Sequence, residues 1–416
     1  MSRVLVIIMA GGAGERLQPL TKGRSKAAVP FGGKFRLIDF TLSNCINSGL
    51  RQVYVLTQYR SGSLNRHIQD GWSLSASGLG DFIYCVPAQQ QLGAEWYQGT
   101  ADAVRQNLNL VNIKEFDHIL ILSGDHIYKM NYVNLIEFHK NHNAALSIAA
   151  IKVPKELSAG KLGVLEAGAD DRLIGFAEKP AVPKVHPSDP NVCLASMGVY
   201  IFNSQFLLES LKCSGVDFGK HIIPALIGGP EDIFVYDYEL NNKIEDIQIE
   251  TKDGVRYRVN VNQTRDSSYW KDVGTIDSYF DASMDLVGIN PLFNLYGERW
   301  IFRTYQRPLP PTKFVLGGRA LESIVSEGCI ISGGSIWNSV ISPNVIIERD
   351  ALIEKSVIFD DVVIEPGARI RRAIIDKECR IHAGAQIGWD VQEDIKRGFS
   401  ISEGSTVVVP KGSDVI

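Results

Sequence analysis

Aliphatic residues recur at every sixth position through the C-terminal part of this 416-residue chain. The most regular row is Val340, Ile346, Leu352, Ile358, Ile364 and Ile370, and a row just before it holds Val345, Ala351, Val357 and Val363. The same step returns in other phases at Ile324, Ile330 and Ile336 and at Ile375, Ile381 and Ile387. This repeat predicts a left-handed parallel β-helix, in which each hexad forms one face of a triangular coil. We interpret the changes of phase near 337 and 371 as insertions at corners.

The first part of the chain instead alternates between short apolar runs and helical patterns. Strands are expected at 4–9, 52–57, 118–122 and 145–153, and helices at 36–47 and 132–141. Thr100 can cap a further helix that runs through Ala103, Val104, Leu108 and Val111. Apolar strands that alternate with helices predict an α/β fold, with a Rossmann-like, mostly parallel sheet and helices on both faces. In such sheets ligands bind beyond the carboxyl ends of the strands.

A proline-rich segment separates the two patterns. It contains Pro291, Pro308, Pro310 and Pro311, which suit neither a helix nor a strand. We therefore predict a catalytic domain over 1–289, a linker over 290–313 and a β-helix domain over 314–416 that serves oligomer contacts and regulation.

Composition excludes several classes of partner. Lys and Arg total 43 against 47 Asp and Glu, a net charge of -4, so no electrostatic argument favours a nucleic-acid or membrane partner. None of the six cysteines forms a CxxC pair, which favours reduced thiols over a zinc or redox site. The start of the chain resembles no signal peptide, and we expect a cytoplasmic protein.

A glycine-rich loop follows the first expected strand. It contains Gly11, Gly12 and Gly14, and Arg16 and Lys26 come shortly after it. The loop matches neither GxxxxGK[ST] nor a clean GxGxxG. Glycines let backbone N–H groups approach an anion, and nearby cations suit phosphate oxygens. The stretch therefore predicts a site for a nucleoside triphosphate.

Two aspartates are candidates for a magnesium site. Asp125 directly follows an apolar strand in Ser123-Gly124-Asp125-His126, where a carboxylate could hold Mg²⁺ against phosphates or simply form a turn. Asp272 precedes an expected helix near Thr275, which it could merely cap. By itself, the pair Glu178-Lys179 is best explained as a surface ion pair.

Taken together, these motifs resemble those of the sugar-nucleotide pyrophosphorylases, in the branch that forms ADP-glucose. The resemblance spans the whole chain and is carried by seven stretches, Met9–Leu17, Phe31–Phe40, Ser43–Gly49, Trp96–Ala103, Gly124–Tyr128, Ala195–Gly198 and Tyr269–Thr275. It implies a reaction in which ATP and α-D-glucose 1-phosphate give ADP-glucose and pyrophosphate with Mg²⁺, committing glucose to glycogen. It also implies a homotetramer regulated by small anionic metabolites.

The resemblance also implies a role for particular residues. Those facing the triphosphate would be Gly11, Gly12, Gly14, Arg16 and Lys26, with Gln58, Gly99 and Thr100 near the nucleotide. Asp125 and Asp272 would hold magnesium, and together with Arg16 and Lys26 would form the catalytic set. Glucose 1-phosphate would be held by Tyr97, Gly163, Glu178, Lys179 and Ser196, with Lys179 on its phosphate. No covalent intermediate is expected.

The chain departs from the family pattern at two positions of the basic loop. Ala27 stands where relatives have proline, and Gly23 stands where many carry an activator-binding lysine. The identity of an activator is therefore left open. Four arginines are candidates for an effector pocket between the domains, Arg24, Arg36, Arg371 and Arg372.

Three alternatives stay open. One is the same chemistry with UTP or dTTP, or another sugar 1-phosphate, since glycine spacing does not specify a base. Another is a weakly catalytic regulatory subunit, although Lys26, Asp125, Lys179 and Asp272 are all present. The third is acyl transfer on the β-helix with His382 as base, although a lone histidine is more often structural.

Overall fold

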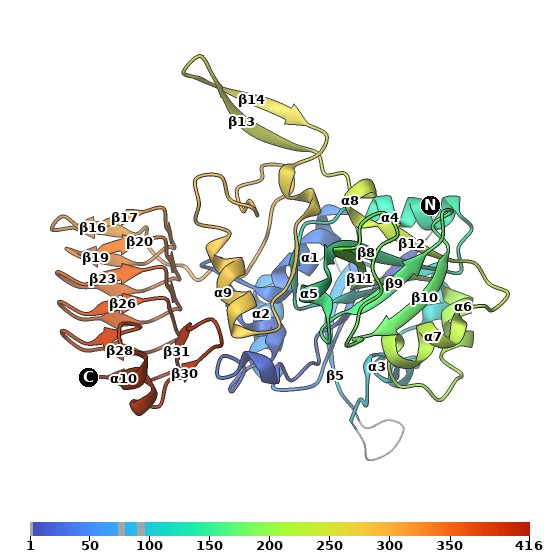
Figure 1. The fold of residues 1–416 in the computed structure, drawn as a ribbon, viewed down its shortest axis with the longest axis horizontal. Helices are drawn as coiled ribbons and strands as arrows, with labels where there is room; N and C mark the ends of the chain where they lie inside the picture. The colour runs from blue at the N-terminus through green and yellow to red at the C-terminus, as the bar shows by residue number, and fades with distance from the viewer. Residues whose placement is uncertain (1–2, 74–79, 90–95) are drawn as a thin grey trace.

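The computed structural model describes residues 3–73, 80–89 and 96–416 and has two parts, an α/β domain and a β-helix (Figure 1). The main sheet has the strand order β10-β9-β11-β6-β1-β4-β5, with β8 pairing β11 and β12 pairing β8. These strands are β1 (Val4–Met9), β4 (Gln52–Thr57), β5 (Phe82–Pro87), β6 (His118–Ser123), β8 (Leu146–Pro154), β9 (Gly163–Ala167), β10 (Leu173–Glu178), β11 (Val192–Asn203) and β12 (Ile233–Asp237). The predicted α/β class is confirmed.

The sheet is parallel where the glycine loop leaves it. β1 runs parallel to β4 and β6, and β4 to β5. The long strand β11 runs antiparallel to β6, β8 and β9, and β9 pairs antiparallel with β10. The part of the sheet that the glycine loop leaves is thus parallel, and an antiparallel extension built on β11 carries β9 and β10.

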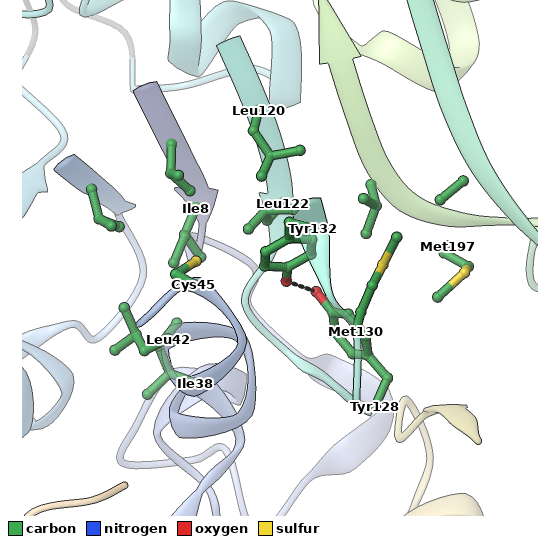
Figure 2. Close-up of a cluster of buried hydrophobic side chains, with 14 of the residues drawn as sticks. Ile8, Ile38, Leu42, Cys45, Leu120, Leu122, Tyr128, Met130, Tyr132 and Met197 are labelled. Atoms are coloured by element: carbon green, nitrogen blue, oxygen red, sulfur yellow. Dashed lines mark hydrogen bonds between the residues drawn. The ribbon is translucent and has the colours of Figure 1, made fainter. Parts of the chain in front are cut away.

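Helices cover both faces of the sheet, as predicted. The helices of this domain are α1 (Leu37–Asn47), α2 (Gly62–Gly71), α3 (Thr100–Gln106), α4 (Tyr132–Asn141), α5 (Lys155–Ser158), α6 (Ser204–Ser210), α7 (Ile223–Leu226), α8 (Tyr238–Asn241) and α9 (Ile276–Met284), of which α9 packs against the β-helix and not on the sheet. Alternate residues of β1 face opposite sides. Val6 and Ile8 join the core with α1, part of which Figure 2 shows, whereas Leu5 and Ile7 join a second core with α3.

The local predictions largely agree with the structure, with one correction at Thr100. β1, β4 and α4 have the expected bounds. Thr100 was expected to cap a helix reaching Val111, but Gly99 is the N-cap and α3 ends at Gln106. The Thr100 hydroxyl instead donates to Asp217 (3.1 Å) and accepts from the backbone N–H of Phe218 (3.0 Å). The Thr100 hydroxyl, which a local cap would use, is therefore engaged in a tertiary contact.

Three short strand pairs complete this domain. They are β2 (Pro30–Phe31) with β3 (Phe35–Arg36), β7 (His126–Tyr128) with β15 (Trp270–Asp272), and β13 (Asp246–Lys252) with β14 (Val255–Val261). The β13–β14 hairpin projects from the body (Figure 1). Among the described residues, no helix is both long and apolar enough to cross a membrane.

The C-terminal domain is the predicted parallel β-helix, with one parallel sheet on each of its three sides. One sheet contains β16 (Lys313–Val315), β19 (Ile330–Ser332), β22 (Ile346–Ile347), β25 (Val363–Ile364), β28 (Arg380–Ile381) and β32 (Asp414–Val415). The second contains β17 (Arg319–Leu321), β20 (Ser335–Trp337), β23 (Leu352–Glu354), β26 (Arg369–Arg371) and β29 (Gln386–Ile387). The third contains β18 (Ile324–Val325), β21 (Val340–Ile341), β24 (Val357–Ile358), β27 (Ala373–Ile375), β31 (Val407–Val409) and β30 (Ser400–Ile401), of which only β30 runs antiparallel.

The phase changes are shortened faces, so their interpretation as corner insertions is wrong. Ile324 pairs with Val340, Val340 with Val357 and Val357 with Ile374, so a coil is sixteen residues long at the start of the β-helix and seventeen from Val340 onward. The fully buried ladder is Ile336, Ile341, Ile347, Ile353, Ile358, Ile364, Ile370, Ile375, Ile381 and Ile387, in which every third step is five residues. The row from Val340 to Ile370 keeps its six-residue spacing without a break because it changes from outward-facing to inward-facing positions between Leu352 and Ile358. A true insertion, holding α10 (Val391–Lys396), interrupts the coil between β29 and β31.

Positive backbone φ angles mark the corners of the coils. Asn338, Asn344, Asp350, Lys355 and Asp361 have φ between 43° and 64°. Asn and Asp tolerate the left-handed conformation better than most residues do, because their short polar side chains can bond locally. This explains why such residues lie between the aliphatic positions.

The β-helix docks on the α/β domain through its third sheet. The outward side chains of Val340, Val357, Ile374 and Val408 share a core with α9. Residues 290–312 form neither helix nor strand, yet Phe293, Trp300 and Phe302 are buried in the same core. The segment predicted as a linker therefore packs closely against the α/β domain.

Candidate active site

The glycine loop folds back onto the basic segment that follows it. Gly14 has φ +65°, and a Cβ there would lie 3.0 Å from Cγ2 of Thr21 and 3.1 Å from Cβ of Lys26. The Thr21 hydroxyl donates to the Gly14 carbonyl at 2.8 Å. Only glycine combines this conformation with such close packing. The loop thus brings Lys26 to the end of β1.

Three charged side chains, far apart in the sequence, meet here. Nζ of Lys26 lies 3.0 Å from Oδ2 of Asp125 and 2.7 Å from Oδ1 of Asp272. The side chains are 10 %, 25 % and 19 % exposed, respectively. One ammonium group therefore bridges two partly buried carboxylates. The structure brings these residues together, and their catalytic role stays a prediction.

The backbone explains why Asp272 reaches Asp125. Asp125 lies in the turn between β6 and β7, and the Ser123 hydroxyl donates to its carboxylate. β15 pairs antiparallel with β7, which puts Asp272 opposite His126. Nε2 of His126 lies 3.7 Å from Asp125 and 3.9 Å from Asp272.

The electrostatics of this cluster favour ionised side chains. Burial by itself would raise the pKa of both aspartates, but Lys26 and His126 outweigh burial and hold both values below the usual range. Burial would lower the pKa of Lys26, but Asp125 and Asp272 raise it above its usual value. The pair thus presents ionised oxygen ligands at neutral pH.

The donor set fits magnesium. Mg²⁺ prefers carboxylate oxygens and is commonly held by one or two carboxylates plus substrate phosphates. Among the described residues, no group of three or more His, Cys, Asp or Glu forms a self-sufficient metal site. Asp125 and Asp272 would therefore hold the ion together with further ligands from water or a substrate. Arg16 lies beside them, since a Cβ at Gly274 would be 3.1 Å from its Nη2 and 3.2 Å from Oδ2 of Asp272.

Of the residues predicted to hold the sugar, Gly163 and Lys179 lie against Glu178 at the end of β10. A Cβ at Gly163 would lie 2.8 Å from its Oε2, and one at Gly219 would lie 2.7 Å from the same atom. Lys179 contacts Glu178 at 3.3 Å and is half exposed. The Ser196 hydroxyl lies 3.4 Å from that of Tyr200. This sugar cluster (Gly163, Glu178, Lys179, Ser196, Tyr200 and Gly219) offers carboxylate, ammonium and hydroxyl groups.

The residues predicted near the nucleotide connect the two clusters. Gln58 donates to the Tyr97 carbonyl at 3.3 Å, and a Cβ at Gly11 would lie 3.2 Å from Cβ of Gln58. The glycine loop therefore lies directly against Gln58. Gly12 has no neighbour within 4 Å of an added Cβ, so the loop is open there.

Gly99 and Tyr97 are held by the protein itself. A Cβ at Gly99 would collide with the Val216 carbonyl, so this position needs glycine for close backbone approach. The Tyr97 hydroxyl accepts a hydrogen bond from Asn107 at 2.7 Å, and the ring lies in the second core. The Tyr97 hydroxyl thus already has a protein partner.

Sequence reasoning missed His126, Trp270 and Asp217. The His126 ring packs edge-on against Trp270, with centroids 5.0 Å apart. Asp217 binds Thr100, and its Oδ1 lies 3.6 Å from the Cβ that Gly219 lacks. His126 and Trp270 are near neighbours of the predicted aspartates in sequence, which is the one signal that could have found them. Nothing local marks Asp217.

The candidate effector arginines fall into two groups. Arg24 is buried and pairs with Asp376 of the β-helix at 2.8 Å, and Arg36 donates to the Ala28 carbonyl at 2.9 Å and lines a small interdomain cavity. Arg371 instead stacks on Trp389 (5.2 Å), and Arg372 donates to the Gly404 carbonyl and lies over Phe280 (5.1 Å). Of these four arginines, only Arg36 is among the described residues that line the interdomain cavity.

The histidine of the β-helix contacts two carboxylates. His382 lies 2.7 Å from Asp414 and 3.4 Å from Glu365. These contacts explain His382 as a structural residue, so an acyl-transfer site is not needed to account for it.

Comparison with known proteins agrees with this architecture. A model of the nucleotidyl transferase family matches residues 5–288, and one of the GlmU-like C-terminal hexapeptide family matches 310–409. The glucose-1-phosphate adenylyltransferase of Rhodopirellula baltica is 44 % identical, over 99 % of this chain and 91 % of its own. That of an Anaeromyxobacter species is 42 % identical over all of both chains, and glucose-1-phosphate adenylyltransferase 2 of Vibrio cholerae is 44 % identical over 99 % and 98 %. The chain therefore belongs to the glucose-1-phosphate adenylyltransferases of the nucleotidyl transferase family.

Proposed function

We propose that this protein transfers the adenylyl group of ATP to α-D-glucose 1-phosphate, giving ADP-glucose and pyrophosphate for glycogen synthesis. The observation that carries the proposal is the meeting of Lys26, Asp125 and Asp272 beside the glycine loop. The full-length similarity to glucose-1-phosphate adenylyltransferases supports the choice of substrates.

The reaction is a displacement at phosphorus. A phosphate oxygen of glucose 1-phosphate attacks the α-phosphorus of ATP, the bond to the β-phosphate breaks, and pyrophosphate leaves with its electron pair. Gly11, Gly12 and Gly14 present backbone N–H groups to the triphosphate, and Arg16 and Lys26 neutralise charge on the leaving group. Magnesium, held by Asp125 and Asp272, supplies further charge neutralisation when bound.

The sugar cluster positions the nucleophile. Glu178, fixed between Gly163 and Gly219, accepts hydrogen bonds from glucose hydroxyls, and Lys179 binds the phosphate. Lys179 has φ +50°, a conformation held by the backbone bond from its N–H to the Leu162 carbonyl at 3.2 Å. Such fixed placement is the main catalytic contribution in phosphoryl transfer.

Regulation and assembly form a second layer of the proposal. The interdomain cavity is lined by four cations, Lys34, Arg36, Arg307 and Lys377, and by two acids, Glu327 and Asp360. Its net positive charge suits a small anionic metabolite, and buried Arg24 lies near Arg36. One Nη atom of Arg24 has no hydrogen-bond partner among the described residues, which leaves it a donor for an anion. We further propose a cytoplasmic homotetramer.

The decisive experiment is a pyrophosphate-release assay on the purified full chain. Glucose 1-phosphate is paired with ATP, UTP or dTTP, and other sugar 1-phosphates replace glucose 1-phosphate. A preference for ATP supports the proposal, whereas a preference for UTP or dTTP assigns the chain to another nucleotide. No turnover with any pair would indicate a regulatory subunit. Sugar phosphates, keto acids and adenylates then test regulation, and sedimentation tests the tetramer.

A further inference from the structure

A second pocket adjoins the reaction centre. It has a volume of about 390 Å³ and lies between the end of β8 with α5 on one side and β15 with α9 on the other. Arg16, Asp272 and Gly274 form part of its wall. We call it the adjoining pocket. The predicted sugar residues Tyr97, Gly163, Glu178, Lys179 and Ser196 do not line it. It is thus a separate volume that meets the catalytic set at Arg16 and Asp272.

Most of the wall is apolar. Its apolar and aromatic residues are Ile151, Val153, Pro154, Leu157, Leu162, Tyr269 and Trp270. Leu157 is 57 % exposed, so a ligand there would remove apolar surface from water. Pockets of this size and character typically hold small organic molecules. A ligand that is ionic throughout, such as pyrophosphate, would make no apolar contacts with these walls.

Two cations in the wall lack ion-pair partners. Lys152 pairs with Asp237 at 2.8 Å, and Lys271 lies 3.8 Å from Asp285. Of the three carboxylates in the wall, Asp272 is bridged by Lys26 and Asp281 lies near Arg372, whereas Glu239 shares Lys152 with Asp237. Within residues 3–73, 80–89 and 96–416, Arg16 and Lys161 form no ion pair. The pocket therefore has unmatched positive charge.

We propose that the adjoining pocket binds an amphipathic organic anion, an apolar body that carries one sulfonate, carboxylate or phosphate group. The body covers Leu157, Leu162 and Val153, and the acid group pairs with Arg16 and Lys161. Because Arg16 is shared, the bound anion excludes the triphosphate and inhibits the enzyme competitively with ATP. This competition rests on the proposed function, whereas binding itself does not.

The test uses 8-anilinonaphthalene-1-sulfonate, whose fluorescence rises in apolar surroundings, and the full-length protein. Lys161→Glu reverses the unmatched charge and Leu157→Asp places a carboxylate on the apolar wall. Lys155→Glu is the matched control, since Lys155 lies in α5 with Leu157, carries the same charge as Lys161 and does not line the pocket. Lys161→Glu should weaken probe binding about three- to tenfold. Leu157→Asp should weaken it at least as much, and Lys155→Glu should not change it.

The competition arm separates this proposal from the proposed function. ATP should displace the probe from wild type, and the probe should raise the KM for ATP without lowering kcat. Lys161→Glu should keep uninhibited turnover and need more probe for the same inhibition. Equal probe affinity in all three variants, or displacement by glucose 1-phosphate but not ATP, would overturn the adjoining pocket as a separate site. Absence of transferase activity in wild type would sink the proposed function, while the variant affinities would still decide the pocket.

Discussion

Asp272 lies directly opposite His126 in the antiparallel pair of β15 and β7. This register brings a carboxylate from the end of the α/β domain next to Asp125, the neighbour of His126. A shift of one residue would turn the Asp272 side chain to the other face of the pair. The proposed metal site thus depends on the register of a strand pair that is three residues long.

Replacing Asp125 with asparagine should remove one of the two carboxylates of that site. We expect kcat to fall about 10²- to 10³-fold while the Michaelis constants change little, because the lost interaction acts mainly in the transition state. Steady-state kinetics at saturating Mg²⁺ measures this. Asp70→Asn, at an exposed position of α2, is the control. Near-normal turnover would refute the metal assignment.

Replacing Lys179 with alanine should affect one substrate selectively. The KM for glucose 1-phosphate should rise roughly tenfold, because a charge-assisted contact to its phosphate is lost, and the KM for ATP should stay nearly constant. Both constants come from initial rates with the other substrate saturating. Lys184→Ala, whose side chain pairs with Glu166, is the matched control. An equal rise in both constants would count against the assigned contact.

Lys26→Met should destabilise the fold in a pH-dependent way. The variant leaves two partly buried carboxylates without their cation, which should cost about 3 kcal/mol of unfolding free energy near neutral pH. Since Lys26 helps to hold both aspartate pKa values low, its stabilisation is present above about pH 4, the unfolded pKa, and is lost as pH falls through the lower folded values.

Denaturant unfolding of wild type and Lys26→Met between pH 3 and 8 tests this dependence. The difference between the two proteins should be constant above about pH 5 and should shrink toward pH 3. Lys22→Met, at an exposed position in the same segment, should show no such trend. A difference that grows in acid would contradict the assigned electrostatics.

The corners of the β-helix should discriminate among side chains. Asp350 has φ +59°, so Asp350→Val should cost about 1–2 kcal/mol of stability, whereas Asp350→Gly should stay within about 0.5 kcal/mol of wild type. Thermal unfolding of both variants makes the comparison. Arg349→Val, next in sequence and outside the left-handed region, should cost less than Asp350→Val.

The chain's own pattern was enough for most of the local elements and for the two fold classes, an α/β sheet followed by a β-helix. Apolar runs such as Val4–Met9 specified their strands because burial on both faces leaves few alternatives for them. Aliphatic spacing identified the β-helix, but the five-residue face lay hidden because Leu352 and Ile358 are six apart even though only Ile358 faces inward.

Tertiary structure decided which of the candidate residues meet. Asp272 came to Asp125 through strand pairing, and Thr100 left its capping role for Asp217, a partner over a hundred residues away. Arg24 pairs with Asp376 only because the β-helix docks on the α/β domain. Periodicity and motif spacing report interactions between near neighbours in sequence, whereas these contacts depend on the relative placement of whole elements, which only packing determines.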